Sequence, residues 1–464
     1  MIGKEGRGSL AKGYEIDMTH GKLLPKIIKF CIPLMLSNLL QVFYNAADVI
    51  VAGRFAGQHA IAAIGSSTHI FSLFTNFFIG MSMGADVVIS QQIGSGDTDS
   101  AQKSVHTSVT VSAVFGTLIA VAGFFLSRGM LVLTNCTPDV LEQASLYLKI
   151  LFLGMPAQMV YNYCAAILRS AGDTKHPLYF LTISGILNII LNVIMVTVFH
   201  KMADGVAIAT VISQYVSVVL VMRLLLRTDG VCNLNPKKLG IDKDSLKAIL
   251  RVGLPTGIQS TVFSISNVVI QSSVNTFGTA VVAGSAAAAN IESFEFTAMD
   301  SVSTAALAFT GQNVGARRID RLKMIAIDCI FVTTAVAVTL GVITAVFAKN
   351  LLAIYIPGET KAIASGAVRV TIFGLSYFIC GIMNIFARMC CGMYRSLGSM
   401  IISMTGACGL RILWIYTVLP LHRSFFMLML CYPISWGITM IALFIYYKHS
   451  KKDLKLKLSQ APSN

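Results

Sequence analysis

One acidic residue, Asp48, lies within a long apolar segment near the beginning of this 464-residue sequence. Asn45, Tyr44 and Gln41 precede it by three, four and seven residues. On an α-helix these spacings place all four side chains on one face. Because a polar or charged face is costly against lipid, we expect this face to meet a protein interior or a cavity.

The carboxyl group of Asp48 is suited to coupling a conformational change to an ion. Burial disfavours its ionised form, whereas a bound cation or nearby hydrogen-bond donors favour it. The neutral form would favour one packing of the helices, and the ionised form would favour cation binding and a second packing. We therefore interpret Asp48, Asn45, Tyr44 and Gln41 as an ion-coupling cluster. The structural alternative is that Asp48 is a permanently hydrogen-bonded tie between helices.

The composition of the chain indicates the class of protein that holds this cluster. Hydrophobic residues make up 55% of the chain and charged residues only 12%, whereas roughly 25% are charged in soluble domains. Apolar runs such as residues 108–126 and 325–347 approach the length of about 20 residues that a membrane-spanning helix needs. We predict an all-α membrane protein with about twelve transmembrane helices.

The net charge of +15 is distributed as in a membrane protein rather than a nucleic-acid-binding protein. With the N-terminus inside, most cations fall at inner helix ends, in residues 4–29, 223–251, 317–323 and 448–457. This pattern predicts a multi-pass protein of a bacterial plasma (inner) membrane with both termini in the cytoplasm. Residues 1–20 and the basic tail 451–464 are then cytoplasmic, and the tail can contact anionic lipid.

No motif in the sequence indicates an enzyme or a metal site. The ten cysteines are scattered without a CxxC spacing, so we interpret them as small apolar side chains. Residues 80–84 match GxSxG, but they lie on a predicted transmembrane helix without an evident partner His and acid. Neither an HExxH motif nor a Walker A loop is present. We expect a protein that is not an enzyme, has no cofactor and uses an ion gradient.

The first helix recurs in the second half of the chain without its acid. Residues 254–256 (Leu-Pro-Thr) correspond to residues 32–34 (Ile-Pro-Leu), and Ile270 stands where Asp48 does. Two further segments at inner helix ends recur in the same order, namely residues 91–94 with 312–315 and residues 168–172 with 394–398. This order indicates a parallel repeat of six plus six helices.

The repeat defines the predicted domains. An N-lobe spans residues 20–228, a C-lobe spans residues 246–450, and the polar residues 229–245 form a cytoplasmic linker. Carriers built from two such lobes bind substrate near the middle of the membrane and expose it to each side in turn. Because only the first helix of the N-lobe carries the acid, we assign the titratable switch to that lobe.

The C-lobe offers an alternative ion or cation site. Glu292 and Glu295 are three residues apart and share a helix face. Two neighbouring carboxylates can share a proton or hold Na⁺ with their oxygens. Asn267 and Gln271 on the preceding helix could complete the lining.

The substrate pocket is weakly specified by the sequence. The chain has 21 Met and 26 Phe residues, and flexible Met with flat aromatic rings suits apolar cations. The same residues are also ordinary packing or lipid-facing surface in a membrane helix. Our candidates for substrate lining are Phe43, Met159, Tyr161, Phe263 and Gln259.

Several motifs together resemble the multidrug and toxic compound extrusion (MATE) transporters, more closely their DinF-like and MepA-like bacterial branch. The resemblance covers residues 20–450, and the combination of motifs is far more specific than any one of them. Three segments carry the resemblance. The first is residues 41–65, which include Gly53 and Ala62-Ala63-x-Gly65. Residues 205–210 (Gly-Val-Ala-Ile-Ala-Thr) are similar to the family's sixth helix, and residues 311–316 (Gly-Gln-Asn-Val-Gly-Ala) are similar to the end of its eighth.

The resemblance implies a V-shaped antiporter of twelve helices that exports organic cations in exchange for H⁺ or Na⁺. It also implies that Asn188 and Asn192 join the N-lobe cluster around Asp48. Many relatives carry Asp-Pro where this chain has Asn192-Val193, so one of the two acids expected of the family is missing. An Asn can hydrogen-bond Asp48 or coordinate Na⁺ through its carbonyl oxygen, but it cannot titrate.

We hypothesise a secondary multidrug efflux antiporter driven by H⁺, with Asp48 as its coupling group. The alternatives are a Na⁺-coupled exporter of the same class and a lipid-linked precursor flippase, which would need several cations in its cavity to meet pyrophosphate. If Asp48 is not the coupling group, Glu292 and Glu295 are the next candidates. The expected partners are small organic cations or amphipathic drugs and the lipid bilayer, and we expect the chain to function as a monomer.

Overall fold

The computed structural model describes residues 16–51, 58–134 and 136–460. Within these ranges the regular elements are helices and no strand occurs, so the predicted all-α fold is confirmed. The motif residue Gly53, residues 1–15 of the N-terminal segment and residues 461–464 of the basic tail lie outside the described residues.

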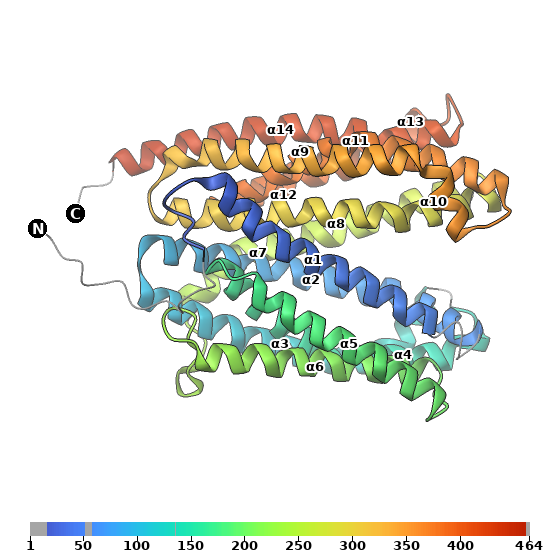
Figure 1. Ribbon diagram of the computed structural model, residues 1–464, viewed down its shortest axis with the longest axis horizontal. Coiled ribbons are helices and arrows are strands. Elements are labelled where there is room, and N and C mark those ends of the chain that lie inside the picture. Colours follow the sequence, from blue (N-terminus) through green and yellow to red (C-terminus); the bar gives the residue numbers. More distant parts are fainter. Residues whose placement is uncertain (1–15, 52–57, 135, 461–464) are drawn as a thin grey trace, which may run out of the picture. The chain divides into compact units, whose positions relative to one another are not determined.

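Twelve helical segments in the described ranges are long enough to cross a bilayer when α12, the π-helical turn η4 and α13 are taken as one (Figure 1). The short pieces η2 (Pro236–Lys238), η3 (Ile319–Arg321) and α10 (Ala348–Tyr355) lie between them. The bounds of the long segments are α1 Leu23–Val51, α2 Gln58–Ser95, α3 Thr98–Leu133, α4 Pro138–Ser170, α5 Lys175–Thr197, α6 Ala203–Arg227, α7 Lys243–Asn275, α8 Thr279–Gly315, α9 Leu322–Val346, α11 Thr360–Gly392, α12 to α13 Ser396–Thr417, and α14 Phe425–Gln460.

Ten of these segments are also apolar enough for a membrane span, as judged over the described residues. The other two, α7 and α8, have a more polar composition, and α8 contains Glu292, Glu295 and Asp300. Both glutamates are buried. Polar groups in a membrane helix are tolerated where they face protein or a water-filled cavity. The set of twelve helices agrees with the predicted number of spans.

The chain divides into two compact units. Unit 1 contains Leu36–Gly257 with the chain up to Asp17, and unit 2 contains Met18–Met35 with Ile258–Asn464. The helices α1 and α7 therefore each contribute to both units, and each changes unit shortly after a proline, Pro33 in α1 and Pro255 in α7. Proline removes one intrahelical hydrogen bond and allows a helix to bend there. The lobe limits of residues 20–228 and 246–450 stay a prediction.

Corresponding helices form the centre of each unit. In unit 1, α4 packs against α2, α3 and α6, and in unit 2, α11 packs against α8, α9 and α14. Glycines permit close approach, because a Cβ on Gly341 of α9 would lie 1.9 Å from the carbonyl oxygen of Gly374 in α11. Membrane helices pack closely where small residues face one another.

Replacing Gly341 by alanine will therefore destabilise unit 2, since the added Cβ cannot fit unless α9 and α11 separate. Gly437→Ala on α14 is the matched control, because a Cβ there meets nothing within 4 Å. We expect Gly341→Ala to lower the melting temperature in detergent by several degrees. Gly437→Ala should leave it unchanged or raise it slightly, because alanine favours helix. Equal melting temperatures for the two variants would contradict the close packing.

Candidate functional site

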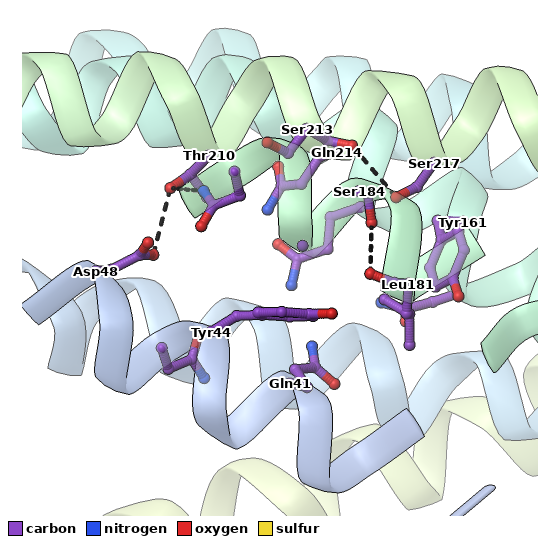
Figure 2. Close-up of a pocket in the computed structure, with 15 residues that line it drawn as sticks. Gln41, Tyr44, Asp48, Tyr161, Leu181, Ser184, Thr210, Ser213, Gln214 and Ser217 are labelled. Atoms are coloured by element: carbon purple, nitrogen blue, oxygen red, sulfur yellow. Dashed lines mark hydrogen bonds between the residues drawn. The ribbon is translucent and has the colours of Figure 1, made fainter. Parts of the chain in front are cut away.

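Unit 1 contains a cavity of about 140 Å³ between α1, α4, α5 and α6 (Figure 2). Apart from Leu181 and Gly185, every residue that lines it has a side chain that can form hydrogen bonds. The polar face predicted on α1 meets this cavity, where its polar groups avoid the cost of contact with lipid. Its members Gln41, Tyr44, Asn45 and Asp48 all line the cavity.

Neutral side chains from α5 and α6 hold the carboxylate of Asp48. The Nδ2 group of Asn192 donates a hydrogen bond to one carboxylate oxygen, and the hydroxyl of Thr210 donates to the other over 3.5 Å. Asn188 connects these two donors: its Nδ2 donates to the Thr210 hydroxyl, and its Oδ1 accepts from Asn192, each over 3.3 Å. The structure thus places both predicted asparagines in one ring of hydrogen bonds with Asp48.

Asp48 has no cationic partner among the described residues, in contrast to Asp86 and Asp300. Asp86 pairs with Arg169 over 3.3 Å, and Asp300 pairs with Arg388 over 3.2 Å. Among the described residues, no Lys, Arg or His forms an ion pair with Asp48. A proton or a cation can therefore reach this carboxylate without displacing a protein cation.

The ring of Tyr44 fixes the distance between α1 and α5. It lies flat against Gly185, where a Cβ would be 1.8 Å from a ring carbon. The hydroxyl of Tyr44 donates to the backbone oxygen of Thr182 over 3.4 Å. Glycine at position 185 thus leaves room for the aromatic ring. Figure 2 shows the ring of Tyr44 at the cavity, near Gln41.

One predicted substrate-lining residue, Tyr161, lines this cavity, and its hydroxyl donates to the backbone oxygen of Pro177 over 3.1 Å. The other four lie elsewhere, because successive residues of a helix point to different faces. Phe43 is 57% exposed on α1, whereas Met159 is buried within α4. The last two, Phe263 and Gln259, lie on the part of α7 that belongs to unit 2.

Glu292 and Glu295 on α8 are both buried but have different partners. The Arg369 guanidinium on α11 donates to both oxygens of Glu292 over 2.8 Å each, which makes a two-point ion pair. Arg369 also donates to the hydroxyl of Ser285 over 2.6 Å. Glu295 accepts a hydrogen bond from Thr344, and its other oxygen is buried without a partner among the described residues. Glu292 is therefore neutralised by an arginine, and Glu295 is not.

Asn267 and Gln271, the other members of the alternative site, are exposed on α7. Gln271 donates to the side-chain oxygen of Asn275 over 3.0 Å. Within the described part of the chain, no hydrogen bond joins Asn267 or Gln271 to either glutamate.

Several residues that define these sites were not identified from the sequence. Thr210 ends the segment at residues 205–210 that resembles the family's sixth helix, but the motif alone does not reveal its contact with Asp48. Arg369 is a lone cation in an apolar run, and such a residue signals a buried partner. Gln158 and Gln214, which line the cavity of unit 1, carry no recognisable signal.

A multi-pass helical chain with a polar cavity around a partly buried acid is the arrangement expected of a membrane transporter. The chain belongs to the MatE family, whose model matches residues 33–194 and 255–417, more than half of the sequence. The two matched segments begin at Pro33 and Pro255, the prolines that mark the predicted repeat. The predictions of MATE membership and of a protein that is not an enzyme are confirmed.

Proteins similar to this chain are named for multidrug resistance. The probable multidrug resistance protein YoeA of Bacillus subtilis is 27% identical over 90% of this chain and 92% of its own length. The probable multidrug resistance protein NorM of Thermotoga maritima is also 27% identical, over 86% of each chain. A solved structure of MATE in complex with MaD3S has a TM-score of 0.89 at 20% identity and covers 96% of this chain and 100% of that chain, which shows the shared fold.

Removing one member of the Glu292–Arg369 pair will destabilise unit 2 more than removing both. Glu292→Gln leaves a buried guanidinium without its counter-charge, which costs about 3–5 kcal/mol. Replacing both residues by leucine removes the uncompensated charge and should recover most of that loss. Glu295→Gln is the matched control and should change the melting temperature little, because its partner Thr344 is neutral. Thermal unfolding in detergent compares these variants, and a Glu292→Gln protein as stable as the wild type would exclude the structural role of the pair.

Proposed function

We propose that this chain is a secondary antiporter that exports cationic or amphipathic organic compounds in exchange for H⁺ by alternating access. One observation carries the proposal: among the described residues, only neutral side chains bind Asp48 in its polar cavity. This carboxyl group adds one negative charge to the cavity when ionised and none when protonated. A proton and an organic cation therefore compete for the same group, which is what an exchange mechanism requires.

Asn192 can serve both states of Asp48. Towards the ionised carboxylate it donates from Nδ2. A protonated Asp48 must instead donate, and a rotation of the Asn192 carboxamide supplies the acceptor Oδ1, which is buried and has no partner among the described residues. Protonation would thus rearrange hydrogen bonds that join α1, α5 and α6. That rearrangement is the proposed link between the proton and a change in helix packing.

Coupling to Na⁺ is the second candidate, and the oxygen atoms around Asp48 favour it. The Asn188 and Asn192 side-chain oxygens and the Thr210 hydroxyl lie in the same ring as the carboxylate. Hard cations prefer carboxylate, carbonyl and hydroxyl oxygens as ligands. A single carboxylate with three neutral oxygens would suit a monovalent ion.

The cavity argues against a lipid-linked precursor flippase. Binding of a pyrophosphate group relies on Arg or Lys side chains. No Lys or Arg stands among the described residues that line the cavity of unit 1. The basic end of α14, which carries Lys448 to Lys457, supports a cytoplasmic C-terminus in a bacterial plasma membrane.

Purified protein in liposomes tests the proposal with a panel of organic cations that includes ethidium and a linear diamine. We expect an imposed pH gradient to drive transport by the wild type and Asp48→Asn to reduce this dependence at least about tenfold, equivalent to 1.4 kcal/mol. Asp328→Asn on α9 is the matched control, because this acid lies in a membrane helix but does not line the cavity.

Each variant is first checked for folding by gel filtration and thermal unfolding. Transport that follows a Na⁺ gradient but not a pH gradient would contradict H⁺ exchange and support the alternative, a Na⁺-coupled exporter. If Asp48→Asn transports as the wild type does under a pH gradient, Asp48 is not the coupling group. Glu295 is then the next candidate to test.

A further inference from the structure

Unit 2 contains a buried arginine, Arg411, that forms no ion pair with an acid among the described residues. It lies on α13 and is only 3% exposed. Two other arginines in the membrane helices of this unit are paired, Arg369 with Glu292 and Arg388 with Asp300. Because a charge inside a membrane is costly, such residues usually pair with an opposite charge or with backbone carbonyl groups. Arg411 therefore calls for a compensating group.

The hydrogen bonds of the two guanidinium groups differ in the same way. Arg369 uses all three of its nitrogens, since Nε and Nη2 donate to Glu292 and Nη1 donates to Ser285. Arg411 donates only from Nε, to the hydroxyl oxygen of Ser435 over 3.0 Å. Its Nη1 and Nη2 donate to no group in the described part of the chain, and both atoms keep some accessible surface. The outer edge of the Arg411 guanidinium can therefore bind an acceptor that the protein does not supply.

Two aromatic rings of α14 hold this guanidinium in place. Its carbon Cζ lies 4.2 Å from the ring centre of Tyr432 and 5.7 Å from that of Trp436. Tyr377 of α11 stacks in turn on Trp436, with the ring centres 5.4 Å apart. An aromatic face attracts a guanidinium but does not take the place of an acceptor in the plane of its N–H groups. The rings thus fix the position of Arg411 and leave its outer edge for a ligand.

A π-helical turn comes directly before Arg411 in the chain. It spans Met404–Gly409, and α13 begins at the next residue, Leu410. Gly406 lets this turn approach α14, since a Cβ there would lie 2.3 Å from Oγ1 of Thr439. Single π-helical turns bend a helix and are frequent at functional sites. The turn and Gly406 thus bring the start of α13 against α14, where Arg411 meets Ser435.

We propose that Arg411 is a binding site for one monovalent anionic group, either a carboxylate or a halide ion. The group accepts hydrogen bonds from Nη1 and Nη2, and its charge neutralises the guanidinium. A carboxylate matches the planar pair of donors with its two oxygens, and a halide supplies the same charge in less space. The site is in unit 2 and does not involve Asp48, so the inference is independent of the proposed exchange of H⁺.

Trp436 is a natural reporter for this site. The chain contains two tryptophans, so Trp414→Phe leaves Trp436 as the only one. Bromide quenches tryptophan fluorescence on contact, and because Trp436 is buried, efficient quenching requires a bromide ion bound beside it. For the purified full chain in detergent we expect quenching that saturates with bromide concentration. Arg411→Gln in the same background should abolish the saturable part.

Arg395→Gln is the matched control, because it removes the same charge from an arginine that pairs with Asp453, and it should keep the saturable quenching. Arg411→Lys is a second variant in case glutamine impairs folding. It keeps the charge but loses the planar pair of donors, and it should weaken bromide binding at least about tenfold.

Propionate, which does not quench, distinguishes the two sources of the charge. Displacement of bromide by propionate would show that the site accepts a carboxylate, and a lack of displacement would restrict it to halides; both results support an anion site. Quenching that rises linearly with bromide, or saturable quenching that neither Arg411 variant changes, would overturn the inference. Either of these last results would leave the proposed exchange at Asp48 untouched.

Discussion

The cost of burying a carboxylate away from bulk water is the constraint on which the rest of unit 1 depends. Such a group needs either a counter-charge or hydrogen-bond donors. Asp48 is on α1, and its donors Asn192 and Thr210 come from α5 and α6. The contact of Tyr44 with Gly185 brings α1 close enough to α5 for this arrangement. One proton on Asp48 can therefore influence the packing of three helices that surround the cavity.

The two units use the same repeat in different ways. In unit 2, the position equivalent to Asp48 is Ile270, which is buried and apolar. Two buried acids of unit 2 are on α8 instead: Arg369 neutralises Glu292 through a two-point ion pair, and Glu295 is bound by Thr344. The carboxylate of Asp48 in unit 1 is bound only by neutral side chains among the described residues. Breaking the Glu292–Arg369 pair in unit 2 would instead leave a buried guanidinium uncompensated. The two repeats thus share a helical scaffold, but only α1 carries an acid at this position.

Much of the fold could be predicted from the sequence, because apolar runs of membrane length and the proline-marked repeat are local features. The spacing of Gln41, Tyr44 and Asp48 likewise predicted one polar helix face. The partner of Glu292 could not be predicted in this way, since α8 and α11 meet only in the folded unit. The candidates Phe43 and Met159 show the limit of composition: their side chains suit a drug pocket, but one lies on an exposed face of α1 and the other within the packing of α4.

The most direct measurement of the central claim is the number of protons released when purified protein in detergent binds the cation that it transports best. Titration calorimetry in buffers with different ionisation enthalpies gives this number, and the measurement is made over a range of pH. We predict that the wild type releases a proton on binding wherever Asp48 is protonated and that Asp48→Asn binds without release. Cation binding by the wild type with no proton release at any pH would contradict exchange at Asp48.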